Sequence, residues 1–128
     1  MSEVKFSKQR EAILSELKSR SDHPTADELY LSLKKEMPSL SLGTVYRNLS
    51  AFHKENLVLK LPAGTAVRFD GDVSEHYHLF CEKCERMYDL NLPVFEKLNS
   101  TASIGYDGEI KSHLLIFLGI CPKCKNDI

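Results

Sequence analysis

Four cysteines form two pairs with the same spacing, Cys81-x-x-Cys84 and Cys121-x-x-Cys124. This spacing lets one tight turn direct two thiolates at a single ion, and two such turns complete the tetrahedral set that zinc prefers. The alternative is a thioredoxin-like redox dithiol, but neither pair opens a helix after a core strand. The pattern therefore predicts a structural zinc site, with the dithiol as the less favoured interpretation.

Histidines and aspartates form a second set of candidate ligands. His76 and His78 alternate along a predicted strand, so both imidazoles project from one face and can approach one ion. Two neutral imidazoles suit zinc, iron, manganese or nickel. Asp70 precedes this pair, Asp89 ends the next strand and His23 lies before a helix, so each comes from a separate segment. Alone, an alternating histidine pair is more often the polar face of a strand, and that interpretation stays open.

The segment before most of these ligands has the pattern of three helices and a hairpin. Ser7, Thr25 and Ser41 each have the chemistry of a helix N-cap, and Glu28 completes a capping box with Thr25. The predicted elements are helices at residues 8–18, 26–37 and 42–54 and strands at residues 57–61 and 66–69. A turn of hairpin chemistry joins the two strands. This order predicts a winged-helix domain over residues 1–70.

The polar residues 71–75 predict a hinge, and a separate α/β domain over residues 76–128 follows it. The order there is strand, Cys-x-x-Cys turn, strand, a short helix at residues 93–100 and a long strand at residues 109–119. Near its end, this last strand is apolar on both faces. It therefore needs a second covering layer, which a partner chain could supply. The whole chain is predicted to have an α+β fold.

Charge and composition say less about function. Residues 1–70 hold 11 Lys and Arg against 9 Asp and Glu, and residues 71–128 hold 6 against 9. This asymmetry is too mild to indicate nucleic-acid binding by itself. Runs of roughly eighteen apolar residues do not occur, and residues 1–10 lack the apolar stretch of a signal peptide. We therefore expect a cytoplasmic protein, in whose reducing environment paired thiols more often hold metal than form disulfides.

Several short motifs stand in a fixed order along nearly the whole chain. They are Gln9-Arg10, His23-Pro24-Thr25-Ala26-Asp27-Glu28, Thr44-Val45-Tyr46-Arg47-Asn48-Leu49, Arg68-Phe69-Asp70, His76-Tyr77-His78 and the two cysteine pairs. In this order they resemble the ferric uptake regulator superfamily and, within it, the peroxide-stress repressor branch. The resemblance implies a homodimer whose winged-helix domain binds an AT-rich inverted repeat in double-stranded DNA. A hinge would join the winged-helix domain to a dimerisation domain that a zinc ion stabilises.

The same resemblance places Thr44, Tyr46 and Arg47 on a recognition helix. There Tyr46 can contact thymine methyl groups, and Arg47 can reach guanine edges or phosphate in the major groove. Arg10, on the first helix, looks like a cation that positions the DNA backbone. For Tyr46 the alternative is packing in the core beside Val45.

The resemblance also implies that His23, Asp70, His76, His78 and Asp89 hold a regulatory ion. A mixed nitrogen and oxygen set suits ferrous iron or manganese better than a four-thiolate cage does. His23 and Asp70 belong to the DNA-binding half or the hinge, whereas the other three belong to the dimerisation domain. A bound ion would therefore fix the angle between the halves, and with it the separation of the two recognition helices of a dimer.

The branch within the superfamily follows from fewer residues. Aspartate at Asp89 is typical of the peroxide branch, in which bound ferrous iron reacts with peroxide and oxidises ligand histidines. Here these would be His23 and His76, and their loss would release the DNA. An iron, zinc or nickel uptake regulator that uses the same ligands remains the alternative.

The chain departs from an iron-sensor pattern that includes a further metal site. Tyr77 stands where that pattern has an oxygen ligand, and Glu75 stands where it has a histidine. This departure disfavours an extra site at Glu96 and His113. We expect His113 to be a satisfied histidine of the interior or of an interface.

Catalytic turnover is not expected. A zinc-dependent hydrolase needs an open metal position and a general base, and five protein ligands around one ion leave little room for a substrate. The sequence therefore predicts a metal-dependent repressor of the peroxide-sensing type, not an enzyme. Its cofactors would be structural Zn²⁺ and regulatory Fe²⁺ or Mn²⁺.

Overall fold

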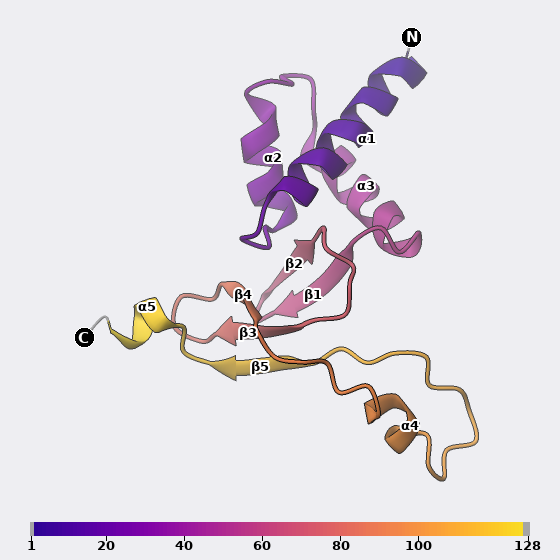
Figure 1. Ribbon diagram of the computed structural model, residues 1–128. Coiled ribbons are helices and arrows are strands. Elements are labelled where there is room, and N and C mark those ends of the chain that lie inside the picture. Colours follow the sequence, from indigo (N-terminus) through magenta and orange to yellow (C-terminus); the bar gives the residue numbers. More distant parts are fainter. Residues whose placement is uncertain (1, 127–128) are drawn as a thin grey trace.

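A computed structural model describes residues 2–126. The elements in chain order are α1 (Ser2–Ser19), α2 (Ala26–Lys34), α3 (Leu42–Lys54), β1 (Leu59–Ala63), β2 (Ala66–Asp70), β3 (Tyr77–Cys81), β4 (Met87–Leu90), α4 (Leu98–Ala102), β5 (Ile116–Gly119) and α5 (Pro122–Lys125). Figure 1 shows the first three helices on one side of the β1–β2 hairpin and the remaining strands on the other. The predicted α+β fold is confirmed.

The first three helices and the hairpin enclose one apolar core. Helix α3 buries Val45, Leu49 and Phe52, which recur every three or four residues and so lie on one face of the helix. Helix α2 buries Leu29 and Leu33 against the same core. This packing fixes which residues of α3 remain outside, and these include the predicted DNA-binding side chains.

Two of the predicted helix caps form, at Thr25 and Ser41, whereas the predicted cap at Ser7 is wrong because Ser7 lies inside α1. The Thr25 side chain accepts a hydrogen bond from the Glu28 amide while the Glu28 carboxylate accepts one from the Thr25 amide, which completes the capping box. Ser41 accepts from the Thr44 amide and begins α3. Asn56, after α3, has the left-handed φ of 61° that its side chain tolerates.

Several element boundaries differ from the prediction. Helix α1 already includes Ser7, because no proline or glycine before it stops the helix from extending. Helix α2 ends at Lys34, and the β1–β2 hairpin turns at Gly64, whose φ of 63° suits glycine. Helix α4 starts only at Leu98. Strand β5 is shorter than predicted, since only Ile116–Gly119 pairs with β3.

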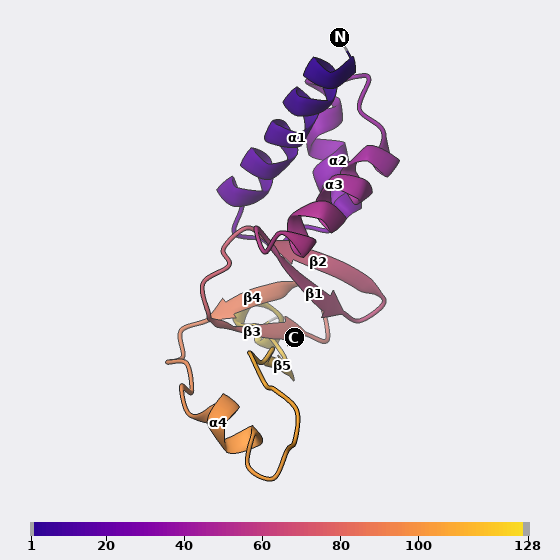
Figure 2. The ribbon, with the colours of Figure 1, turned by 90° about the vertical axis from the view of Figure 1, so that its right-hand side faces the viewer.

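The second half of the chain forms a three-stranded sheet of order β4-β3-β5, in which β4 is antiparallel and β5 parallel to β3. It shares a small core with the hairpin, where Leu61 and Ala63 of β1 pack with Phe80 and Met87. Figure 2 shows the hairpin lying over these strands. Gly71 passes so close to α1 that a Cβ there would lie 2.8 Å from the Lys18 Cα. The two halves are therefore in direct contact.

The region around α4 extends away from this sheet in both views (Figures 1 and 2). Helix α4 has no buried residue. Large apolar side chains are exposed on this region, on β5 and directly after it, namely Phe95, Leu98, Ile104, Tyr106, Leu114, Phe117, Leu118 and Ile120. Within residues 2–126, no helix is both long enough and apolar enough to cross a membrane.

Candidate functional site

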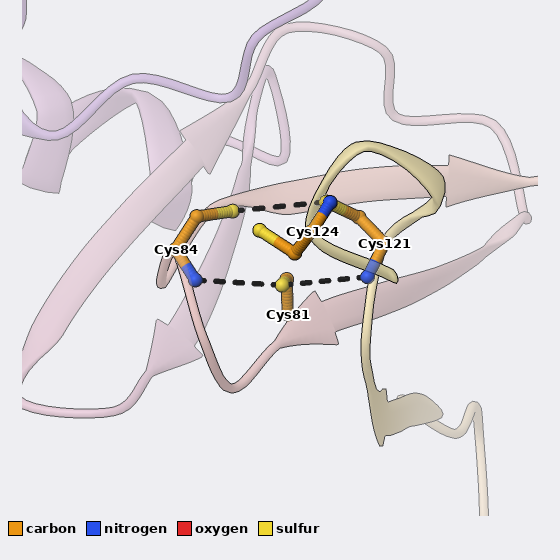
Figure 3. A group of neighbouring side chains, drawn as sticks. All are labelled: Cys81, Cys84, Cys121 and Cys124. Atoms are coloured by element: carbon orange, nitrogen blue, oxygen red, sulfur yellow. Dashed lines mark hydrogen bonds between the residues drawn. The ribbon is translucent and has the colours of Figure 1, made fainter. Parts of the chain in front are cut away.

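The four cysteines come together at one end of the three-stranded sheet (Figure 3). Cys81 ends β3 and Cys84 lies in the turn after it, whereas Cys121 caps α5 and Cys124 lies within it. Because β3 and β5 are parallel neighbours, with Cys81 opposite Gly119, both turns leave the sheet at the same edge. The four sulfurs lie within 4.8 Å of one another.

The sulfur geometry agrees with the donor set of a zinc site. The Cys84 and Cys121 sulfurs are 3.9 Å apart, and tetrahedral zinc with bonds of about 2.3 Å separates its sulfurs by about 3.8 Å. The Cys81 sulfur accepts the amides of Cys84 and Cys121, each at 3.4 Å, and the Cys121 sulfur accepts the Cys124 amide at 3.5 Å. All four cysteines are free thiols.

The charges of the cluster point to a cation. The Cys84 amide is the main cause that lowers the pKa of Cys81, to about 6, so this thiol ionises readily. Burial, together with the neighbouring sulfurs, raises the pKa of Cys124 to about 12. Without a cation the four thiols therefore do not ionise together at neutral pH. A bound divalent ion supplies the missing positive charge, so the donor set fits zinc.

The structure also brings together the five predicted nitrogen and oxygen ligands. His23 lies in the loop between α1 and α2, Asp70 ends β2 and His76 directly precedes β3. His78 in β3 is paired with Asp89 in β4, so their side chains lie on the same face of the sheet. One ligand atom from each residue lies within 4.8 Å of the others.

Each imidazole Nε2 lies close to both carboxylates. The distances to Asp70 Oδ2 are 3.1, 2.9 and 3.0 Å from His23, His76 and His78, and those to Asp89 Oδ1 are 2.8, 3.1 and 3.3 Å. Each Nε2 carries at most one proton, so three rings cannot donate hydrogen bonds in all these contacts. Ligands at right angles around an ion, with bonds of about 2.1 Å, are about 3.0 Å apart. The distances therefore fit one ion held by three nitrogens and two carboxylate oxygens.

Hydrogen bonds outside the cluster orient its ligands. His76 Nδ1 lies 2.6 Å from the Ser74 carbonyl; donation of its proton there leaves Nε2 free to bind an ion. The Asp72 amide donates to Asp70 Oδ1 at 2.9 Å, so Oδ2 faces the imidazoles. Among residues 2–126, no group forms a hydrogen bond with the buried Nδ1 atoms of His23 and His78.

Protons and a metal ion compete for this cluster. Burial lowers the pKa of His23, but hydrogen bonds and charge interactions with Asp70 and Asp89 outweigh it and raise the pKa overall. The pKa of His76 is raised against the same opposing burial, chiefly by the Ser74 carbonyl and Asp70. Burial raises the pKa of Asp70, yet hydrogen bonds to His23 and His78 and from the Asp72 amide leave it far below its usual range. Asp89 is 51% exposed and connects the cluster with solvent.

His113 has protein partners of its own. Its Nε2 lies 2.8 Å from the Tyr77 hydroxyl and its Nδ1 lies 2.7 Å from the Asn99 side-chain oxygen. The Tyr77 hydroxyl also accepts the Phe95 amide at 2.9 Å. In the described part of the chain, neither His113 nor Glu96 belongs to a group of three or more metal ligands.

The predicted DNA-binding residues all lie on the outer surface of the helical domain. Arg10, Thr44 and Arg47 line one hollow of about 380 Å³ between α1 and α3. Arg10 forms an ion pair with Glu55 at 2.9 Å. Tyr46 is 49% exposed, and its hydroxyl donates to Asp27, so it does not pack in the core with Val45.

Sequence reasoning missed some residues that support these sites. Asn48 lines the same hollow as Arg10, and its amide donates to the Thr44 carbonyl at 2.8 Å. Tyr88 lies 3.6 Å from the Cys84 sulfur. Arg68 contacts the loop that carries His23. Asn48 and Arg68 both stand inside motifs that carried the family resemblance, and this was the one available signal.

Comparisons with known proteins agree on a single family. A model described as the ferric uptake regulator family matches residues 1–118, a range that ends before the second cysteine pair. The peroxide-responsive repressor PerR of Staphylococcus epidermidis is 35% identical over 125 residues, which cover 97% of this chain and 83% of that protein. The PerR protein of Staphylococcus aureus is also 35% identical, over 124 residues that cover 96% of this chain and 84% of that protein.

Solved structures give the same result for the fold. The peroxide stress regulator of Campylobacter jejuni is similar with a TM-score of 0.79 and 31% identity, over 96% of this chain and 93% of that one. The ferric uptake regulator of Helicobacter pylori has a TM-score of 0.78 and 26% identity, over 93% of this chain and 81% of that one. That second structure is described as revealing three functional metal-binding sites.

Proposed function

The chain belongs to the ferric uptake regulator family, and from this membership we propose that it is a metal-dependent transcriptional repressor that senses peroxide. The observation that carries the proposal is the cage of three imidazoles and two carboxylates, in which each Nε2 lies 2.8–3.3 Å from both oxygens. A cage of this kind suits ferrous iron or manganese. The chain is a regulator and not an enzyme, since the cage serves to hold an ion rather than to process a substrate.

Zinc would have a structural role in this protein. Cys81, Cys84, Cys121 and Cys124 hold it and tie the end of β3 to α5. The three-stranded sheet is small, and its core with the hairpin contains few buried side chains. A domain of this size commonly needs a metal or another staple to be stable.

The regulatory ion would connect the two halves of the chain. We assign residues 1–70 to the DNA-binding domain, residues 71–75 to the hinge and residues 76–128 to the domain for dimerisation and metal binding. His23 and Asp70 then reach the ion from one side, and His76, His78 and Asp89 reach it from the other. Ion binding favours the one arrangement in which all five meet, so it shifts the population towards that arrangement.

A homodimer would present two copies of α3 to the major grooves of double-stranded DNA. The exposed apolar side chains around α4 and on β5 provide the surface that a second copy covers. In the helical domain, Thr44, Tyr46 and Arg47 approach the bases while Arg10 contacts the DNA backbone. The operator would be an inverted repeat, because a symmetric dimer reads two half-sites about one helical turn apart, and it would be AT-rich, as the family resemblance implies. Such a repressor acts in the cytoplasm, with the DNA.

Peroxide would end repression by changing the ligands. A bound ferrous ion would supply the chemistry that activates peroxide, and the net change in the protein would be one oxygen atom inserted into an imidazole C–H bond, with water released. His23 and His76 are the residues that take up this oxygen. An oxidised ring no longer offers the same Nε2 lone pair, so the two halves lose their shared ligand set. Asp89, the exposed member of the cage, lies where solvent and peroxide reach it.

The test is mass spectrometry of protein loaded with Fe²⁺ and exposed to mild peroxide. We expect one added oxygen on His23 or His76, together with loss of operator binding, and neither change in protein loaded with Mn²⁺. Unmodified histidines with intact operator binding would contradict peroxide sensing. They would instead identify a regulator that responds to iron, zinc or nickel only and uses the same five ligands.

A further inference from the structure

His23 reaches the metal cage from an unfavourable backbone conformation. Its φ is 52°, in the left-handed region that non-glycine residues adopt at a cost. Its side chain is only 2% exposed, so the ring is fixed among the other ligands. A residue in this conformation persists where its surroundings hold it in place, and the structure shows which groups do so.

Strand β2 holds His23 at two points. Asp70 Oδ2 lies 3.1 Å from the His23 Nε2, and Arg68 donates from Nη1 to the His23 carbonyl at 3.1 Å. Arg68 and Asp70 are two residues apart in one strand, so their side chains leave it on the same face. Pro24, the residue after His23, is also bound to this strand: the Phe69 amide donates to the Pro24 carbonyl at 2.9 Å.

Arg68 is in turn held by the start of α2. The same Nη1 lies 2.9 Å from Glu28 Oε1, and the Arg68 side chain is only 10% exposed. Glu28 Oε1 also accepts the Thr25 amide, so the carboxylate cannot move without disturbing the helix cap. Next to it, Asp27 accepts a hydrogen bond from the Tyr46 hydroxyl on α3. The His23 loop, the capping box and the recognition helix are thus connected by side chains.

We propose that Arg68 and Glu28 form a positioning pair that presents His23 to the regulatory ion and joins that ligand to the first turn of α2. This inference rests on the proposed regulatory site. A pair with only a structural role would stabilise the fold in the same way with or without the ion. A positioning pair, in contrast, changes the affinity for the ion by more than its effect on stability accounts for.

The experiment compares Arg68→Met with Arg20→Met in the full-length, zinc-loaded protein. Arg20 is a matched control because its side chain is 20% exposed and pairs with Asp22 at 2.7 Å, but none of its hydrogen bonds or ion pairs involves a residue of the cage. Mn²⁺ affinity is measured by the electron paramagnetic resonance of the free ion, and Tm is measured without Mn²⁺. We expect Arg68→Met to weaken Mn²⁺ binding by about 10- to 100-fold, as second-sphere changes do. Arg20→Met should stay within about threefold of the parent even at a similar loss of Tm.

Glu28→Gln provides a second variant that keeps the fold. Glutamine can still complete a capping box, so this change removes the charge opposite Arg68 and keeps the cap. It should weaken Mn²⁺ binding several-fold, and it stands in for Arg68→Met if that variant does not fold. The proposal is overturned if the folded variants lose Tm but bind Mn²⁺ within twofold of the parent, or if Arg20→Met weakens binding as much. Parent protein that binds no Mn²⁺ would instead refute the regulatory site and this proposal with it.

Discussion

The two ligand clusters differ in where along the chain their residues come from. All four cysteines belong to the second half and lie at one edge of a single sheet, where two parallel strands end. The five nitrogen and oxygen ligands come from a loop between helices, the end of the hairpin and two strands of the sheet. The cysteine cluster can therefore form whenever the sheet forms. The other cluster exists only while both halves of the chain keep one arrangement.

The chemistry of the donors matches this difference. Thiolates hold zinc tightly, and a closed four-sulfur site has no open position for other ligands. Imidazole and carboxylate bind ferrous iron or manganese more weakly and in competition with protons. One cluster thus suits a permanent ion and the other a reversible one. This comparison generates the following predictions.

Loss of the first cluster should have the largest effect. Cys121→Ser removes a sulfur that accepts the Cys124 amide and lies 3.9 Å from the Cys84 sulfur, and zinc sites of this type contribute about 10 kcal/mol or more to folding. We expect the variant to lose its zinc and the folded sheet, and with it the dimer. Zinc content by mass spectrometry and molar mass by light scattering check this. A zinc-free variant that is still a folded dimer would show that the cysteines are not structural.

Loss of one ligand of the second cluster should abolish regulation and leave the fold intact. His78 is buried, and its Nε2 lies 3.0 Å from Asp70 Oδ2, so His78→Ala leaves a gap in the middle of the cage. We expect Mn²⁺ affinity to fall by more than about 100-fold, beyond what a second-sphere change causes. Operator binding should no longer respond to metal, while the zinc content stays that of the parent. Titration with Mn²⁺ followed by a gel-shift assay measures both.

The sequence predicted which residues come together in each cluster. The spacing of the two Cys-x-x-Cys turns and of His-x-His indicated side chains that share a turn or a face, whereas His23, Asp70 and Asp89 were assigned as ligands through the family resemblance, and the strand register places Asp89 opposite His78. The capping box at Thr25 likewise depends only on residues three apart. Features that depend on spacing within one element were therefore accessible before the fold was known.

Contacts between distant segments were not accessible in this way. Nothing in the spacing of residues indicates that Arg68 donates to the His23 carbonyl, or that the hairpin residue Leu61 packs with Phe80 of the sheet. The length of β5 was overestimated for a related reason. Its apolar pattern continues before Ile116, but a strand needs a neighbour, and β3 pairs with only the last four residues of that segment.

A change of pH should affect metal binding at the two clusters differently, with a smaller change in Mn²⁺ affinity than the loss of a ligand causes. The pKa values of His23 and His76 are raised above the ordinary 6.5, so in the metal-free protein these rings hold protons that Mn²⁺ must displace. Binding therefore releases protons, and the affinity falls as the pH falls. We expect Mn²⁺ to bind about tenfold more weakly at about pH 6.5 than at about pH 7.5, while zinc is retained at both. Calorimetry in two buffers of different ionisation enthalpy counts the released protons, and a count of zero would contradict the prediction.

The Tyr77 network should have the smallest effect on metal binding, although Tyr77 stands between two ligands of the cage. Its hydroxyl accepts the Phe95 amide and contacts His113, so it connects β3 with the region before α4 and not with the ion. Tyr77→Phe leaves the amide and the imidazole without this partner, which costs about 1–3 kcal/mol of stability. We expect a lower urea midpoint for the zinc-loaded protein, with Mn²⁺ affinity within about threefold of the parent. A large loss of Mn²⁺ affinity would mean that the Tyr77 network also supports the ion. The reversible site would then include residues beyond its five ligands, in contrast to the cysteine cluster.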